Sequence, residues 1–222
     1  MKTIAEIISE QLNGLMISGN RCSYLPYNME FALSVIERIG KGIVPSFEIK
    51  EAHLEMYSEL IRYFHADPEF KGDLNKGFLL MGPTGTGKTL AMEIMRIYRT
   101  IDNTKIIRNG KLYEMRFNII TVNEIVNQFI NHSFEGIDHY CERYVLCIDD
   151  IGAECEQVKH YGNTLDVIGH IISERYAKKL ITFGTTNFPL STLEQKYDDR
   201  TISRMYALFN FMTLKCDDFR KK

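Results

Sequence analysis

The first third of the chain carries apolar residues at helical spacing. This spacing predicts helices over residues 3–15, 29–40 and 48–65, with a loop over 18–28 after the first. The third helix is expected to stop before Asp67-Pro68, because the residue preceding a proline disfavours helical geometry. Residues 71–77 have the composition of a linker. The pattern therefore predicts a helical N-terminal segment over residues 1–71, followed by a domain over residues 72–222.

From residue 77 onward the pattern changes to alternating strands and helices. Strands are predicted over 77–82, 116–122, 144–149, 180–186 and 209–214, and helices over 88–100, 123–132, 163–178 and 190–197. Asn109-Gly110 predicts a hairpin turn within this region. Such alternation is typical of an α/β fold in which helices cover both faces of a parallel sheet. Ligands of such sheets bind at the carboxyl ends of the strands.

The loop after the first predicted strand fits the phosphate-binding pattern G-x-x-x-x-G-K-S/T. Its residues are Gly82, Pro83, Thr84, Gly85, Thr86, Gly87, Lys88 and Thr89, and the next helix continues from Leu90. The glycines let backbone N–H groups surround phosphates, Lys88 would reach the β and γ phosphates, and the Thr89 hydroxyl would bind Mg²⁺. A chance glycine-rich turn lacks this strand–loop–helix context. We therefore expect a P-loop protein that binds a nucleoside triphosphate.

The strand over 144–149 ends in two carboxylates, Asp149 and Asp150. This is the Walker B pattern, and we expect its apolar run to pack beside the P-loop strand. Asp149 would share Mg²⁺ with Thr89, and Asp150 would orient or deprotonate the attacking water. Glu154 is a second candidate base, because Asp150 is one methylene shorter than the glutamate common at this position. The alternative is a plain turn, which aspartate also favours.

Two later segments complete the predicted site. Asn187 follows the next buried strand and would hold the water near the γ-phosphate, although asparagine at a strand end also starts turns. Arg200 and Arg204 lie four residues apart on one helical face. We interpret them, and Arg204 first, as an arginine finger that reaches the nucleotide of a neighbouring subunit. The alternative is a surface ion pair with Asp198 or Asp199.

These motifs together resemble the AAA+ ATPases of the DnaC/IstB type, which are bacterial helicase loaders and transposition helpers. The resemblance rests on the P-loop, on residues 148–154, on residues 173–176 followed by 181–187, and on residues 199–205; it covers about residues 72–220. It implies ATP bound at subunit boundaries, assembly into a homo-oligomer and contact with single-stranded DNA. It also implies that the N-terminal segment docks a protein partner such as a replicative helicase or a transposase.

The sequence departs from this family in three places. Cys216 and Asp218 stand where the family tends to have Gly and Ser, which weakens a role for Arg220 at the nucleotide. The chain stops soon after its last predicted strand, so we expect no helical lid domain at the C-terminus. The N-terminal helices lack the cysteine cluster of some loaders, which leaves helicase docking a weaker inference.

Composition and charge add three constraints. The chain has a net charge of −2, but residues 1–75 carry a net charge of −4, which suits a protein partner better than a phosphate backbone. The five cysteines form no C-x-x-C pair, so we expect neither a disulfide framework nor a zinc site. No apolar run approaches the length of a membrane span and the N-terminus does not resemble a signal peptide, so a cytoplasmic location is expected.

Basic residues gather around the predicted hairpin. Residues 96–116 carry a net charge of +4, from Arg96, Arg99, Lys105, Arg108, Lys111 and Arg116 against Asp102 and Glu114, with Tyr98 and Tyr113 between them. A basic, aromatic protrusion is suited to single-stranded DNA. A hairpin whose charges only face solvent is the equally weighted alternative.

The leading functional hypothesis is an ATPase that acts in DNA replication as a helicase loader or nucleoprotein remodeller. A transposition helper shares every motif named above. An ATP-switched adaptor with negligible hydrolysis is a further alternative, which the shorter Asp150 side chain permits. A small-molecule kinase is disfavoured, because neither an acceptor site nor a phosphate-closing lid is recognisable.

Overall fold

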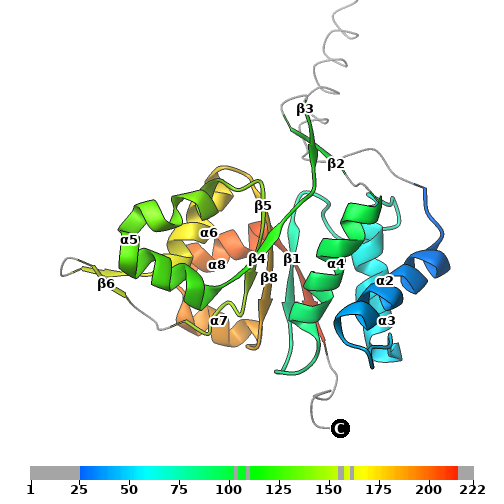
Figure 1. Cartoon of the computed structure of the whole chain (residues 1–222). Coiled ribbons are helices and arrows are strands. Elements are labelled where there is room, and N and C mark those ends of the chain that lie inside the picture. Colours follow the sequence, from blue (N-terminus) through cyan, green and yellow to red (C-terminus); the bar gives the residue numbers. More distant parts are fainter. Residues whose placement is uncertain (1–25, 103–104, 109–110, 155–157, 161–162, 215–222) are drawn as a thin grey trace, which may run out of the picture.

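The computed structural model describes residues 26–102, 105–108, 111–154, 158–160 and 163–214 (Figure 1). The side chains of residues 101–113 and 155–164 lie outside this description. The predicted helix over 3–15 and the tail residues Cys216, Asp218 and Arg220 also lie outside the described residues. Within the described residues, no helix has the length and apolar character needed to cross a bilayer.

Five parallel strands form the central sheet. They are β1 (Gly77–Met81), β4 (Asn118–Thr121), β5 (Val145–Asp149), β8 (Ile181–Thr186) and β9 (Phe209–Thr213), in the order β4-β5-β8-β1-β9. Strands β1, β5 and β8 are buried along their whole length, as expected for parallel strands covered on both faces. The predicted α/β P-loop NTPase fold is confirmed.

One expectation about the sheet is wrong. The Walker B strand β5 does not pack beside the P-loop strand β1, because β8 pairs with both and lies between them. The apolar runs of β1, β5 and β8 are similar, so periodicity contains no information on their order. Gly184 of β8 allows the close packing, since an added Cβ there would lie 2.7 Å from Ile151 Cδ1 and 3.0 Å from Leu79 Cδ1.

Helices cover both faces of the sheet (Figure 1). On one face lie α5 (Val122–Glu142), α6 (Val167–Ala177) and α8 (Asp199–Leu208), with the short α7 (Leu190–Lys196) before α8. On the other face α4 (Lys88–Asp102) packs with the N-terminal helices. Helix α5 continues ten residues past its predicted end at residue 132, across a kink at Ser133, whose φ is 55°.

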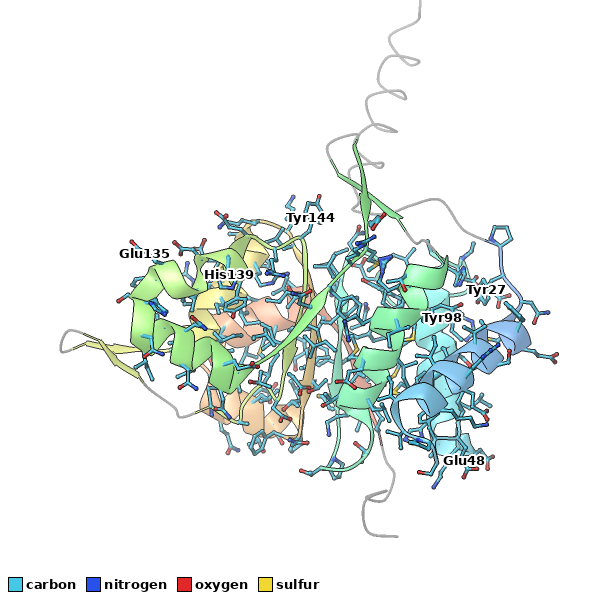
Figure 2. All side chains as sticks on the ribbon, viewed as in Figure 1. Tyr27, Glu48, Tyr98, Glu135, His139 and Tyr144 are labelled. Atoms are coloured by element: carbon cyan, nitrogen blue, oxygen red, sulfur yellow. The ribbon has the colours of Figure 1, made fainter. Side chains whose placement is uncertain are left out.

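The N-terminal helices share the core of the sheet. Helices α2 (Met29–Ile43) and α3 (Glu51–Phe64) pack in one hydrophobic cluster with β1, β8 and α4. Tyr63 of α3 contacts Phe78 of β1 and Phe183 of β8, with ring centroids 5.1 and 5.8 Å away. Figure 2 shows Tyr98 of α4 near these helices, where its hydroxyl lies 2.8 Å from His65 Nε2. The division at residue 71 stays a prediction, but residues 29–64 are packed as part of the same core.

Two antiparallel hairpins extend beyond the sheet. Strands β2 (Lys105–Arg108) and β3 (Lys111–Glu114) pair around the predicted turn and project away from the body of the molecule (Figure 1). Strands β6 (Val158–His160) and β7 (Asn163–Leu165) form a hairpin that the sequence did not predict. Helix α6 consequently begins at Val167, after the N-cap Asp166, and not at residue 163.

Candidate functional site

The P-loop turns tightly between β1 and α4 through glycines in left-handed conformations. Gly82, Gly85 and Gly87 have φ values of 154°, 84° and 84°. Gly82 has a second constraint, because an added Cβ would lie 2.6 Å from the carbonyl oxygen of Leu214. Inside the loop, the Thr86 hydroxyl donates to the Pro83 carbonyl at 2.9 Å. The sequence pattern therefore corresponds to a compact loop at the N-terminus of a helix, a geometry suited to anions.

Lys88 joins this loop to the end of β8. Its side chain is 4% exposed. The ammonium donates to the carbonyls of Gly82 and Pro83 at 2.7 and 2.8 Å, and to Asn187 Oδ1 at 2.8 Å. The charge is thus held at the loop by oxygen acceptors, next to Asn187, which was predicted to hold the water near the γ-phosphate.

The two carboxylates at the end of β5 are held by neighbouring hydroxyl and amide groups. Asp149 Oδ1 accepts from Thr89 Oγ1 at 2.8 Å and from Thr185 Oγ1 at 2.6 Å. Asp150 has a φ of 61°, and its Oδ1 accepts from Asn187 Nδ2 at 2.8 Å. Asn187 therefore bridges Lys88 and Asp150. Five predicted site residues, from three segments distant in sequence, lie together at one edge of the sheet.

Thr185 is a site residue that sequence reasoning missed. It is fully buried in β8. Its hydroxyl donates to Asp149 and accepts from the backbone N–H of Asp150 at 3.0 Å, so it fixes both acidic positions at once. The available signal was a polar residue two positions before Asn187, although Thr182 and Thr186 of the same strand are polar too. Because strand residues alternate faces, residues 185 and 187 point in the same direction.

A cavity of about 730 Å³ opens beside the P-loop. Gly85, Lys88, Thr89, Asp150 and Asn187 line one side of it. The opposite side comes from α2, α3 and the chain between them, through Ile43, Val44, Phe47, Met56 and Tyr57, with Glu48 also in the lining (Figure 2). The volume is within the range of about 300–1,000 Å³ common for ligand sites. From the sequence, the N-terminal helices were assigned only to the binding of a protein partner, and their contribution to the lining of this cavity was not predicted.

His53 of α3 also lines the cavity and contacts the P-loop directly. Its Nε2 lies 3.1 Å from the Thr86 carbonyl, so this nitrogen donates. The ring is 7% exposed. Burial lowers the pKa of His53 below its usual value, and the nearby Lys50 lowers it further, while the Thr86 contact acts in the opposite direction. The neutral ring is therefore the favoured form in the folded protein.

Glu154, Arg200 and Arg204 do not line the cavity. The Glu154 carboxylate contacts the Tyr197 hydroxyl and Lys196 Nζ instead, which removes it as a second candidate base. Arg204 donates to Ser173 Oγ and lies 5.9 Å from the Tyr176 ring centroid. Within the part of the chain that the structure describes, neither arginine forms an ion pair with Asp198 or Asp199.

Two residues of the basic segment 96–116 that were predicted to lie on the surface are buried. Tyr98 and Arg99 are 4% and 1% exposed, so neither is available to a nucleic acid. Their positions continue the buried stripe of α4 that includes Met92 and Met95, and helical spacing would have predicted this. Arg116 is exposed and forms an ion pair with Glu114. The side chains of Lys105, Arg108, Lys111 and Tyr113 lie outside the described residues.

No protein-family model and no curated protein sequence matches the chain. Among solved structures, a proposed primosome component from Streptococcus pyogenes serotype M3 is 20% identical, with a TM-score of 0.57 over 83% of this chain and 97% of that one. The DnaC helicase loader is 18% identical, with a TM-score of 0.58 over 78% of this chain and 96% of that one. The replication initiator DnaA, bound to AMPPCP and single-stranded DNA, is 16% identical, with a TM-score of 0.54 over 78% and 49%.

At such low identities these likenesses establish the fold alone. The parallel sheet, with the P-loop between β1 and α4, is a fold that this chain shares with these solved structures. The chain therefore has an α/β P-loop NTPase fold, which it shares with the DnaC helicase loader.

Proposed function

We propose that this protein binds and hydrolyses ATP and acts in DNA replication as a helicase loader or nucleoprotein remodeller. The observation that carries the proposal is the convergence of Lys88, Thr89, Asp150 and Asn187 at one cavity, with Asp149 hydrogen-bonded to Thr89. Three structural relatives support the biological role, since they are a proposed primosome component, a helicase loader and a replication initiator.

The cavity offers different chemistry at its two ends. The P-loop amides and Lys88 suit the phosphates, while Ile43, Val44 and Met56 offer apolar surface to the base. Thr89 Oγ1 and Asp149 Oδ1, 2.8 Å apart, are the hard oxygen donors that Mg²⁺ prefers. When bound there, Mg²⁺ would neutralise charge that develops on the phosphates.

Hydrolysis needs a base and a positioned water. In the proposed mechanism Asp150 accepts the proton of the attacking water. Asn187 Nδ2 donates to Asp150 Oδ1 at 2.8 Å and so orients the carboxylate. The water that contacts this carboxylate then faces the γ-phosphate. Asp150 lies in a turn with a left-handed φ of 61°. In the proposed mechanism this turn brings the carboxylate toward the water and offsets the shorter side chain of aspartate.

Arg204, with Arg200 as the second candidate, is proposed to act in the site of a neighbouring subunit. Neither side chain lines the cavity of its own chain, so a role at the γ-phosphate requires a second copy. This makes a homo-oligomer the active form. Single-stranded DNA is proposed to contact the exposed part of segment 96–116, and the N-terminal helices are proposed to bind a protein partner.

The test is ATP turnover measured across a protein concentration series, with and without single-stranded DNA. Turnover per subunit that rises with both supports a self-assembling, DNA-linked ATPase. Lys88→Ala should abolish nucleotide binding, whereas the matched control Lys178→Ala, at the exposed C-cap of α6, should leave it unchanged. Micromolar binding retained by Lys88→Ala would refute the site.

An ATP-switched adaptor is the second candidate, favoured by the aspartate at position 150. Tight ATP binding with flat, negligible turnover at every protein concentration would replace the ATPase with this adaptor. A transposition helper is separated from a helicase loader by its partner: the first should bind a transposase and the second a replicative helicase.

A further inference from the structure

Hydrogen bonds connect the turn that follows the Walker B strand, residues 150–154, to the end of helix α7. Glu154 Oε2 accepts from the backbone N–H of Gly152 at 3.0 Å, which closes the turn on itself. Glu154 Oε1 accepts from the Tyr197 hydroxyl. In the reverse direction, Lys196 Nζ donates to the carbonyls of Gly152 and Glu154 at 2.6 and 2.5 Å. Contacts therefore run both ways between the turn and residues 196–197.

These groups are removed from solvent. The side chains of Glu154 and Lys196 are 4% and 15% exposed, and Lys196 Nζ lies 3.5 Å from Glu154 Oε1. Tyr197 is 5% exposed. Gly152, with a φ of 95°, permits the close approach, because an added Cβ would lie 2.9 Å from both Leu193 of α7 and Phe188. A buried ion pair of this kind is costly to break from one side, so the contact is rigid.

The two ends of this contact belong to different parts of the proposed reaction. At one end Asp149, which accepts from Thr89, comes directly before the turn, and Asp150, which begins it, lines the cavity of the same chain. At the other end Tyr197 is followed at once by Asp198, the N-cap of α8, which accepts from the Thr201 N–H at 2.6 Å. Helix α8 then carries Arg200 and Arg204.

We propose that Glu154 is a positioning residue that couples the nucleotide site of one subunit to helix α8 of the same subunit. This helix carries Arg200 and Arg204, faces the neighbouring subunit and is called the arginine helix below. A displacement of the Asp150 turn reaches α8 through Glu154, Lys196 and Tyr197, with no other chain segment between them. Glu154 contacts no reacting atom and acts only through these residues. The proposal deepens the proposed function and rests on it, since it assumes that Arg204 or Arg200 acts across a subunit boundary.

The first test follows backbone hydrogen exchange in the dilute protein, with and without AMPPCP and Mg²⁺. In the wild type, the analogue should slow exchange in residues 190–208. Glu154→Ala should lose this response while protection of β1 and β5 stays as in the wild type. Glu154→Gln keeps one carbonyl oxygen as an acceptor, while its amide NH2 can donate to the Tyr197 hydroxyl oxygen, so it should retain part of the response. Loss of the response in Glu154→Ala with partial rescue in Glu154→Gln is not expected of a residue that merely stabilises the fold.

Two outcomes of this test would overturn the coupling: no response of residues 190–208 in the wild type, or the full response in Glu154→Ala. If Glu154→Ala does not fold, Tyr197→Phe serves instead, because it removes one hydrogen bond and keeps the ring. Exchange is measured without turnover, so this experiment decides the coupling even if the protein proves not to hydrolyse ATP.

The second test distinguishes a defect in the nucleotide site from a defect in the arginine helix. Variants are mixed at concentrations at which the protein assembles. Glu154→Ala alone should lower kcat by about tenfold with the KM for ATP little changed, a size expected of a coupling between sites. Mixing it with Asp150→Asn, which should bind ATP without hydrolysing it and so present a nucleotide-positioned arginine helix, should restore turnover, as should mixing Arg204→Ala with Asp150→Asn. Asp150→Asn mixed with Lys88→Ala should stay inactive. Failure of the first mixture to recover would place the defect in the Glu154 subunit's own site and overturn the proposal. Absence of turnover in the wild type would instead refute the proposed ATPase.

Discussion

Replacing Thr185 by valine isolates the contribution of one hydroxyl to the acidic edge of the site. Valine keeps the shape of threonine but removes the donor to Asp149 Oδ1, at 2.6 Å, and the acceptor of the Asp150 N–H, at 3.0 Å. The residue is fully buried, so water does not replace either partner. The substitution therefore leaves one carboxylate oxygen and one amide with fewer partners, and changes little else.

The size of the effect can be worked out from these two contacts. A hydrogen bond to a charged group contributes about 1.5–3 kcal/mol, and a buried donor without an acceptor costs about 1–3 kcal/mol. Because the added methyl group recovers part of this, we expect a loss of about 2–4 kcal/mol in the free energy of unfolding. Loss of a group that orients a metal ligand typically weakens metal affinity by about 10–100-fold. We expect a shift of this size in the Mg²⁺ dependence of ATP-analogue binding.

The measurement is fluorescent ATP-analogue binding titrated with Mg²⁺, combined with urea unfolding. Thr182→Val is the matched control, because Thr182 is equally buried in β8 but accepts from Arg175 Nε at 2.9 Å, away from the acids. It should lose stability without a change in the Mg²⁺ midpoint, and Thr185→Ser should stay close to the wild type. An unchanged midpoint in Thr185→Val, with stability lost as in the control, would refute the role assigned to this hydroxyl.

Three further predictions concern groups whose environment the structure defines. Arg175→Met should lower the free energy of unfolding by about 3–5 kcal/mol in urea, because the buried guanidinium donates to the carbonyls of Tyr140, Arg143 and Ile181; a loss below about 1 kcal/mol would contradict this. Gly82→Ala should weaken ATP binding and destabilise the fold by more than about 2 kcal/mol, since its Cβ would meet the Leu214 carbonyl at 2.6 Å; a calorimetric scan and a binding titration check both effects. The pKa of His53 is lowered from 6.5 in the fold, so unfolding takes up a proton, and the stability due to the neutral ring is complete above about pH 6.5 and declines as the pH falls toward the folded-state pKa. Urea unfolding at about pH 7.5 and about pH 5.5 should show a smaller acid-induced loss in His53→Gln than in the wild type, and an equal loss would refute the assignment.

The sequence was sufficient for features that are determined by a short stretch of chain. Residues 82–89 specify the P-loop because left-handed glycines and the lysine act within one turn. The hairpin around residues 109–110 was predicted for the same reason, since its turn chemistry is local. In contrast, the β6–β7 hairpin has strands of three residues each, too short to show an alternating pattern.

The order of strands and the wall of the cavity were not predictable in this way. Strands β1, β5 and β8 are all buried along their whole length, although β8 contains three threonines, and neither burial nor composition places β8 between the other two. Met56 lies in the helix predicted over 48–65 and Ile43 and Val44 follow the helix predicted over 29–40, and neither prediction says which apolar residues border a cavity. Tyr98 and Arg99 are a different case, because counting the helical period from Met92 and Met95 would have placed both in the core.

Distance along the chain does not by itself explain which parts of the site could be predicted. Thr89 and Asp149 are 60 residues apart, and Lys88 and Asn187 are 99 apart, yet both pairs were expected to meet. They meet because parallel strands bring their carboxyl ends to one edge, a rule that holds for any sequence with this fold. Glu154 and Tyr197 are only 43 residues apart, but they meet beyond that edge, where a turn and a short helix pack in a way specific to this chain. General rules of the fold therefore predict the groups proposed to hold the nucleotide, whereas the groups that connect this site to helix α8 emerge only from the packed structure.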